Sequence, residues 1–313
     1  MGSSAKENYR EWSSTAPELR LFSYAWWLDA VCPNNWNASV VEKNREIVAA
    51  VPYTFAKRAG QRVIKMPELT PWLDIFIRYP EGQKYTKQLA YEKEMFTALI
   101  EQLPRVPRFR QRYGYAFTNW LPFYWNGFKQ TTRYSYVLAD LANLDLVFAE
   151  CRENIRREIR KAQKRLTVTE RDDLEMFYQF NLKTFERQNK KPSFSYELLQ
   201  RVDAACQEHQ CRKIFFASEG DRIHAVIYVV WDDHSAYYLM GGADPALRSS
   251  GASSLLMWHA IQFAATVTEQ FDFEGSMIEP IERFFRSFGA VQTPYFSISK
   301  NRGLFKLLEP FGG

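Results

Sequence analysis

The spacing of apolar residues along the second half of the chain predicts alternating helices and strands. Residues 141–165 hold the longest helical pattern, and residues 173–189 and 196–209 follow the same period of about 3.6 residues. Apolar runs separated by two short acidic or glycine-containing turns then predict an antiparallel meander over residues 213–240. Short helices and strands over residues 254–298 complete the pattern, which is typical of an α+β layer.

The first half of the chain has a different pattern and is richer in tryptophan. An amphipathic run that ends at Pro104 predicts a long helix over residues 86–103. Valine- and isoleucine-rich runs predict strands over residues 39–44, 46–58, 61–67, 113–118 and 131–137, with an aromatic loop at 119–128. Seven of the nine tryptophans lie within the first 125 residues. We therefore expect two domains, residues 1–139 and 140–313.

The composition is that of an ordinary globular chain, with 46% hydrophobic and 25% charged residues. The net charge of +5 does not by itself indicate a nucleic-acid partner. The apolar runs are much shorter than the ~20 residues that span a bilayer, and residues 1–14 lack an apolar signal core. We therefore expect a cytoplasmic protein, and the sequence does not indicate its oligomeric state.

The cysteines do not indicate a disulfide framework or a metal site. Four cysteines in 313 residues are too few for a secreted disulfide scaffold. Cys206, His209 and Cys211 cluster, but no second pair stands at zinc-finger spacing. We therefore predict no metal.

The segment 151–166 predicts an amphipathic helix with one basic face. Ile155, Ile159 and Ala162 fall on one apolar stripe, and the opposite arc is basic. The basic residues are Arg156, Arg157, Arg160, Lys161, Lys164 and Arg165. This face either captures an anionic ligand such as phosphates or RNA, or is a solvated surface that neighbouring glutamates partly balance.

A glycine- and serine-rich segment follows the third strand of the meander. Gly241 and Gly242 are expected to kink or bulge that strand, which would leave a backbone N–H to polarise a carbonyl. The next loop, Arg248-Ser-Ser-Gly251-Ala252-Ser253, leads into a helix whose free backbone N–H groups suit an anion. The alternative is an ordinary loop with serine caps.

Two carboxylates lie together in the predicted strand 271–274. Strand alternation puts Asp272 and Glu274 on one face, and carboxylates inside a sheet need partners or a wet cleft. Glu274 is therefore a candidate general base or amine ligand. The alternative is a structural ion pair with Arg283 or Arg286.

The segment 237–300 resembles the C-terminal domain of FemAB-like proteins, a branch of the GNAT acyltransferase superfamily. The run FDFEGSMIEPIERFFRSFGAVQTPYF, residues 271–296, carries most of this resemblance, and ENIRREIRKAQKR, residues 153–165, resembles the helix that opens the domain. The resemblance implies an α+β fold of two tandem GNAT-like domains packed around a shared cleft. Each domain would have a mixed, mostly antiparallel sheet with helices on both faces.

The resemblance also implies amide formation from an activated acyl donor. Characterised FemAB-like members transfer an amino acid from aminoacyl-tRNA to an amine on a peptidoglycan precursor, whereas the wider superfamily uses acetyl-CoA. In the wider superfamily, an Arg-x-x-Gly-x-Gly/Ala loop holds the pyrophosphate of CoA. Arg248 and Gly251 match this loop, and Ser253 stands at its last position. The donor is left open between acetyl-CoA and aminoacyl-tRNA, and no tightly bound cofactor is expected.

These considerations define the expected site. Glu274 would act as the base or hold the amine, and the backbone near Leu239 and Gly241 would polarise the carbonyl. The residues expected to hold a donor phosphate are Arg248, Gly251, Ala252 and Ser253. The residues expected to bind the substrate are Arg156, Arg160, Tyr238, Ser276, Arg283, Arg286 and Lys300.

We therefore expect a bacterial acyltransferase that transfers an acyl or aminoacyl group to an amine. The acceptor would be a small molecule or an envelope precursor of peptidoglycan or polysaccharide synthesis, and tRNA is a possible partner. One alternative is an acetyl-CoA-dependent N-acetyltransferase. Another is a non-catalytic module that binds RNA or a nucleotide-sugar.

Overall fold

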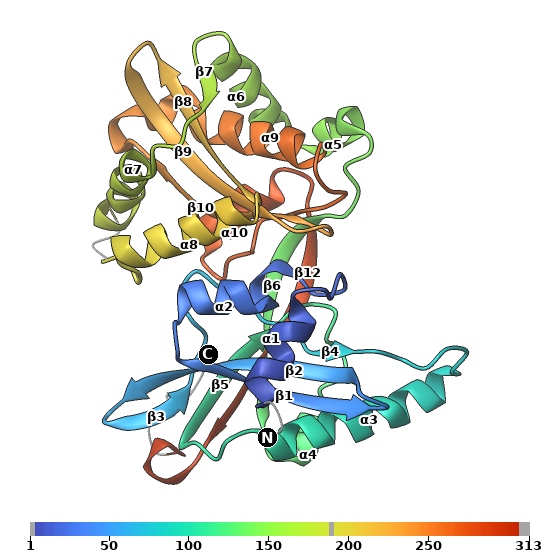
Figure 1. Cartoon of the computed structure of the whole chain (residues 1–313). Helices are drawn as coiled ribbons and strands as arrows, with labels where there is room; N and C mark the ends of the chain where they lie inside the picture. Colours follow the sequence, from blue (N-terminus) through green and yellow to red (C-terminus); the bar gives the residue numbers. More distant parts are fainter. Residues whose placement is uncertain (1–3, 188–190, 307–313) are drawn as a thin grey trace. The chain divides into compact units, whose positions relative to one another are not determined.

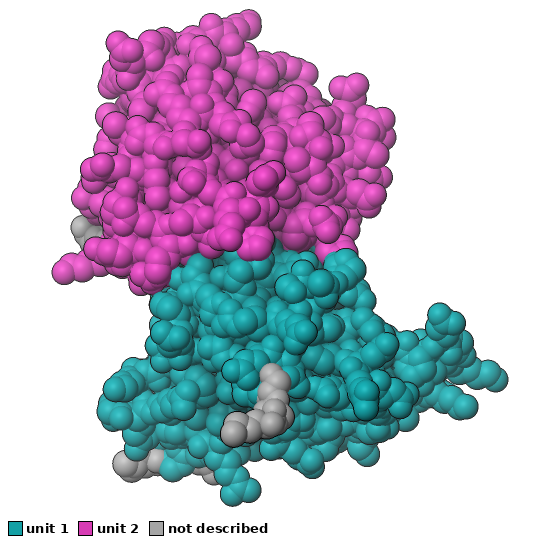
Figure 2. All heavy atoms as spheres, viewed as in Figure 1, with its two compact units in different colours: residues 1–133, 294–313 teal, residues 134–293 magenta. Residues whose placement is uncertain are grey.

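The chain forms two compact units, which Figure 2 distinguishes by colour. The structure is a computed structural model that describes residues 4–187 and 191–306. Unit 1 comprises residues 1–133 and 294–313, and unit 2 comprises residues 134–293. The division expected from the sequence falls after residue 139. Unit 2 instead begins at residue 134, and the chain returns to unit 1 at residue 294, within its last strand.

Unit 1 is a mixed, mostly antiparallel sheet with helices (Figure 1). Its strands are β1 (Trp36–Lys43), β2 (Glu46–Arg58), β3 (Gln61–Ile64), β4 (Phe76–Ile77) and β5 (Arg108–Tyr113), joined by the second half of β12 (Val291–Asn301). Its helices are α1 (Ala5–Ser13), α2 (Ala25–Val31), α3 (Tyr85–Gln102) and α4 (Leu121–Trp125), with short 3-10 turns at Leu21–Ser23 and Gly303–Lys306. Strands β1, β2 and β3 pair antiparallel, and β3 pairs parallel with β5.

Unit 2 has the strand order β6-β11-β10-β9-β8-β7. The strands are β6 (Lys129–Leu138), β7 (Thr167–Glu170), β8 (Arg212–Glu219), β9 (Arg222–Trp231), β10 (Ala236–Ala243) and β11 (Phe271–Asp272). The helices are α5 (Leu144–Glu150), α6 (Glu153–Gln163), α7 (Leu174–Arg187), α8 (Tyr196–Glu208), α9 (Ala252–Ala264) and α10 (Glu279–Arg286), with a 3-10 turn at Pro245–Ser250. The pairing is antiparallel except between β10 and β11.

Side chains alternate between the two faces of the unit 2 sheet. Ile227 and Val229 of β9 join a core that α6 and α9 cover. Tyr228, between them, faces the other helices: its ring contacts Phe177 of α7, and its hydroxyl donates to Asp203 of α8. Helices therefore cover both faces of this sheet, as Figure 1 shows.

The two units repeat one order of elements. In unit 1, three antiparallel strands lead into α3 and then into β5, which pairs parallel with β3. In unit 2, β8, β9 and β10 lead into α9 and then into β11, which pairs parallel with β10. A right-handed crossover through a helix is the usual way to make such a parallel pair. The expected α+β fold of two tandem units is therefore confirmed.

Three sequence-based element predictions differ from the structure, and one cannot be compared with it. The helix expected over residues 141–165 is two helices, because Cys151 is extended and the backbone N–H of Arg152 donates to Ser287 O at 2.9 Å. The aromatic loop at 119–128 contains α4, which begins at Leu121 and has Pro122 in its first turn. Strand β5 lies before the expected range 113–118, because its outward arginines hide the alternation of Phe109, Gln111 and Tyr113. The end expected for α7, residue 189, lies outside the described residues.

Candidate active site

A β-bulge interrupts β10 of unit 2. Tyr238 pairs with Val229 and Met240 pairs with Tyr228, so Leu239 is an extra residue without a partner in the register. An extra residue of this kind turns one backbone group away from the ladder. The bulge lies before the glycine pair, and the register from Met240 to Ala243 is regular. The bulge expected at Gly241 and Gly242 therefore lies at Leu239 instead.

The parallel pairing beside this bulge is short and opens into a wedge. β10 and β11 pair at Ala236 with Phe271 and at Tyr237 with Asp272. The chain after β11 instead follows β6, since Phe273 N donates to Tyr136 O at 3.0 Å. β10 runs on to Ala243 without this neighbour. The bulge thus lies where β10 and the segment after β11 separate.

Glu274 is placed at this wedge by a left-handed turn. Its φ is 57°, so it ends the strand rather than continuing the alternation that puts Asp272 and Glu274 on one face. The Glu274 backbone N–H donates to Asp272 Oδ1 at 2.7 Å, and Ser135 Oγ donates to the same oxygen. Asp272 itself is fully buried. Asp272 therefore fixes the turn that presents Glu274.

The Tyr238 hydroxyl lies beside Gly241 and within electrostatic range of Glu274. A Cβ placed on Gly241 would come within 2.6 Å of the Tyr238 hydroxyl oxygen. Burial is the main cause that raises the pKa of Tyr238 to about 12, and the negative charge of the Glu274 carboxylate adds to it. The phenol therefore keeps its proton at neutral pH and can donate a hydrogen bond. A proton donor thus lies beside the bulged strand, and a carboxylate lies within its electrostatic range.

Helix α7 packs its backbone directly against the glycine pair. A Cβ on Gly242 would lie 2.3 Å from Phe180 O, so glycine is needed for this close approach. Asn181 Nδ2 donates to Gly241 O at 2.9 Å. Asn181 is 3% exposed, and its Oδ1 has no hydrogen-bond partner within the described ranges.

Asn181 was not among the residues expected from the sequence. The sequence pattern that could have indicated Asn181 is its position on the apolar face of a predicted helix, the face that also carries Phe177 and Phe180. Buried amides need partners, so an asparagine at such a position indicates a backbone contact or a ligand.

The start of α9, which was expected to hold a phosphate, is engaged by α6. Gly251 has a φ of 77°, and a Cβ there would lie 3.0 Å from Glu158 O. Ser254 Oγ in the first turn donates to Glu158 Oε2 at 2.8 Å. Ala252 is buried, whereas Arg248 and Ser253 are exposed. A carboxylate thus already interacts with this helix terminus, where it benefits from the helix dipole.

The basic face of α6 makes local contacts. Arg156 donates to Ala149 O at 2.7 Å, and the Arg160 guanidinium lies 5.4 Å from the ring centroid of Phe148. Arg165 forms a bidentate pair with Glu219. These contacts fit the solvated-surface interpretation of the face without testing its role in binding.

The remaining expected residues are distributed over α10 and unit 1. Arg286 pairs with Glu282. The hydrogen bonds that Glu282 accepts from Arg286 and from the Tyr136 hydroxyl lower the pKa of its carboxyl. Arg283 is exposed, and Ser276 Oγ accepts from Ile278 N at 3.0 Å in the turn before α10. Lys300 belongs to unit 1, where its ammonium donates to Asn126 O.

The corresponding position in unit 1 is filled by its own chain. β3 and β5 pair through Ile64 and Phe109, and the next backbone groups of β5 bond to a connecting segment. Arg112 N donates to Met66 Sδ at 3.3 Å, and Leu73 N donates to Arg112 O at 3.0 Å. The wedge in unit 2 has no such insertion from residues 273–275, which follow β6 instead.

The comparisons with known proteins agree with this fold. Residues 149–277 match the family model described as an acetyltransferase (GNAT) domain. No curated protein matches the chain. Among solved structures, FemX is similar over 99% of both chains, at 14% identity and a TM-score of 0.68.

Two further structures are similar over most of the chain. The C-terminal domain of a putative lysylphosphatidylglycerol synthetase from Agrobacterium fabrum has 12% identity and a TM-score of 0.60, and the match covers 97% of this chain and 95% of that one. L-PGS from Bacillus licheniformis has 14% identity and a TM-score of 0.53, with coverages of 88% and 87%.

The segment that matches the acetyltransferase (GNAT) domain model, residues 149–277, lies within unit 2. The fold of the whole chain is similar to that of FemX, which agrees at the level of fold with the resemblance to FemAB-like proteins. None of the helices between residues 4 and 306 that the structure describes has the length and apolarity of a membrane span.

Proposed function

We propose that the protein is an acyltransferase that forms an amide at the wedge beside β10. The observation that carries this proposal is the Leu239 bulge beside the Tyr238 hydroxyl, with Glu274 presented by the turn that follows the neighbouring strand β11. Acyl transfer needs few groups: a base for the amine, a donor for the developing oxyanion and a means of positioning. The wedge offers one candidate for each.

The proposed reaction is attack of a neutral amine on an ester or thioester carbonyl. Glu274 accepts the proton that the amine loses as the new C–N bond forms. The backbone at Leu239 to Gly241 donates to the carbonyl oxygen. The C–O or C–S bond then breaks, and Tyr238 supplies the proton that the leaving group takes. Because its pKa is raised, the Tyr238 phenol is still protonated when the leaving group departs and can donate this proton.

The donor that we favour is an aminoacyl ester rather than acetyl-CoA. Glu158 and Ser254 interact at the start of α9, where a CoA pyrophosphate would need backbone N–H groups and no carboxylate. The similarity to FemX covers the whole chain, and another similar structure is named a putative lysylphosphatidylglycerol synthetase. We therefore propose aminoacyl-tRNA as donor and an amine of an envelope precursor as acceptor.

The test is the rate of aminoacyl transfer from a panel of charged tRNAs to amine acceptors, with wild type and Glu274→Gln. Loss of a general base typically costs 10²–10⁴-fold, so we expect at least about a 100-fold drop in kcat. Glu279→Gln, at an exposed position on α10, is the matched control and should keep wild-type rates. Unchanged turnover in Glu274→Gln would show that the base is elsewhere.

A second candidate is an acetyl-CoA-dependent N-acetyltransferase, which the GNAT family match favours. Calorimetric titration with acetyl-CoA and CoA separates it from the first. We expect no binding at micromolar concentrations. If micromolar binding is seen and Gly251→Asp abolishes it, the donor is CoA, and the argument from Glu158 is wrong.

A further inference from the structure

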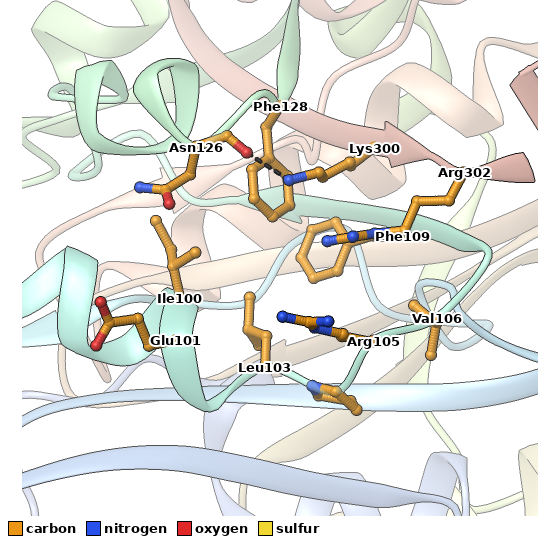
Figure 3. A pocket seen from close by; sticks show the side chains of 11 residues that line it. Ile100, Glu101, Leu103, Arg105, Val106, Phe109, Asn126, Phe128, Lys300 and Arg302 are labelled. Atoms are coloured by element: carbon orange, nitrogen blue, oxygen red, sulfur yellow. Dashed lines mark hydrogen bonds between the residues drawn. The ribbon is translucent and has the colours of Figure 1, made fainter.

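A pocket in unit 1 combines an apolar floor with a cationic rim (Figure 3). Its volume is about 230 Å³. The floor is formed by Ile100, Leu103, Val106, Phe109 and Phe128, and the rim carries Arg105, Lys300 and Arg302 with Glu101. Phe109 and Phe128 are buried, whereas Arg105 and Arg302 are exposed.

Lys300 is held at the edge of the pocket, whereas the two arginines of the rim are exposed. The Lys300 ammonium donates to Asn126 O and lies 4.7 Å from the ring centroid of Phe128. Neither Arg105 nor Arg302 has a side-chain ion pair within the described part of the chain. Among the described residues that line the pocket, three are cations and one is a carboxylate, and this excess of positive charge suits an anion.

Helix α4, directly before this pocket, exposes three large apolar side chains. Leu121, Tyr124 and Trp125 are 48%, 58% and 57% exposed. The helix is next to the rim, since Gly127 follows it and a Cβ there would lie 3.7 Å from Lys300 Nζ. The Lys93 ammonium lies 5.1 Å from the ring centroid of Trp125. We call these three side chains, together with Arg105, Lys300 and Arg302, the α4 surface.

The charge of the chain is concentrated on the unit that carries this surface. Unit 1 has 22 Lys and Arg against 13 Asp and Glu, a net charge of +9. Unit 2 has 19 against 23, a net charge of −4. The mild overall value of +5 therefore conceals one strongly basic unit.

We propose that the α4 surface docks on an anionic lipid bilayer, a role beyond the proposed reaction and independent of it. Exposed tryptophan, tyrosine and leucine beside lysine and arginine are typical of a protein that lies at the membrane interface. Leu121, Tyr124 and Trp125 would enter the headgroup region, and Arg105, Lys300 and Arg302 would bind lipid phosphates. A nucleic acid is the competing anion, but Leu121 has no π-face for stacking on a base.

Cosedimentation of the full chain with vesicles tests this proposal. We expect binding to vesicles of phosphatidylcholine with phosphatidylglycerol, weaker binding as salt rises, and little binding to pure phosphatidylcholine. Arg105→Gln with Arg302→Gln should weaken binding about fivefold for each charge removed, from about 1 kcal/mol per basic residue near such a surface. Leu121→Ser with Trp125→Ser should also weaken it, at unchanged salt dependence.

Matched pairs in unit 2 serve as controls. Lys161→Gln with Lys164→Gln removes two exposed charges from α6, and Leu146→Ser with Val291→Ser removes two exposed apolar side chains. Both control pairs should bind vesicles as the wild type does. The proposal is overturned if the chain does not bind anionic vesicles, or if the control pairs weaken binding equally. Loss of tRNA binding in the arginine pair, with vesicle binding intact, would identify a nucleic-acid surface instead.

Discussion

At the scale of single residues, Asp272 supports the candidate site through its neighbour. A non-glycine residue in the left-handed region costs about 1–2 kcal/mol, and Glu274 occupies it. The hydrogen bond from Glu274 N to Asp272 offsets part of this cost. Gly275 is also left-handed, and a Cβ there would lie 2.0 Å from Tyr134 O. Backbone packing and one buried carboxylate thus hold Glu274 at the wedge.

Tyr238 provides a prediction at this scale. We expect Tyr238→Phe to lower kcat by about 100-fold, the range typical of a lost acid catalyst, because phenylalanine keeps the aromatic ring but has no hydroxyl to donate a proton. With a pKa of about 12, the phenol in the wild type stays protonated at the usual assay pH values. The wild-type rate should therefore show no loss from this group up to about pH 10, the ordinary tyrosine value.

The pH profile of kcat for both proteins is the measurement. Tyr237→Phe is the control, since its hydroxyl donates to Asp232 at 2.9 Å, away from Glu274. That variant should lose stability and keep kcat. If Tyr238→Phe turns over as fast as the wild type, another group protonates the leaving group.

The residues of the candidate site differ in how far the sequence could indicate them. Glu274 and the stretch from Tyr238 to Gly241 carry local signals, a carboxylate after an apolar strand and a glycine pair. Asn181 lies 60 residues before Gly241, so no local pattern joins them. Spacing cannot show the left-handed turn at Glu274 either, because contacts with β6 set it.

At the scale of elements, the close packing of α7 on β10 positions one side of the site. The two elements meet at Gly242, where Phe180 O leaves no room for a side chain. Periodicity predicts α7 and β10 separately, but the contact between them depends on this glycine. The break between α5 and α6 is similar, since a hydrogen bond to Ser287 causes it. Such tertiary contacts override the local helical pattern.

Gly242→Ala is the prediction at this scale. The added methyl must displace α7, so we expect a destabilisation of about 1–3 kcal/mol, as for overpacked cores, and a loss of activity. Gly82→Ala is the control, because its φ is 67° but nothing lies within 4 Å of the added Cβ. That variant should cost only the left-handed strain of about 1 kcal/mol and keep kcat. Denaturant unfolding and kcat are the measurements, and a kcat of Gly242→Ala equal to wild type would separate α7 from the site.

At the scale of the whole molecule, charge and chemistry are divided between two units of one topology. Unit 2 carries the open wedge and a net charge of −4, whereas unit 1 has the corresponding position filled and a net charge of +9. Where one copy of a repeated fold has its site position occupied by its own chain, that copy can carry a different function. The proposed reaction and the proposed membrane contact accordingly fall on different units.

The boundary of unit 2 gives the last prediction. The change in composition along the sequence places this boundary at residue 140. In the structure, however, β11 pairs with Val137 and Leu138 of β6. Ser135 and Tyr136 of the same strand bond to Asp272 and to Glu282. A fragment of residues 140–313 lacks all of these partners. We therefore expect it to lose cooperative unfolding, because β11 becomes an unpaired edge and Asp272 a buried charge with fewer partners.

A fragment of residues 134–293 retains this strand and ends where the chain leaves the unit. It should unfold cooperatively on heating, as followed by circular dichroism, since its core from α6, α9 and the sheet is intact. A third fragment, residues 140–293, differs from this one only in the six residues 134–139, so comparing these two isolates the contribution of β6. If these two fragments melt alike, the pairing of β6 with β11 does not hold unit 2 together, and Glu274 must be positioned by the rest of the sheet.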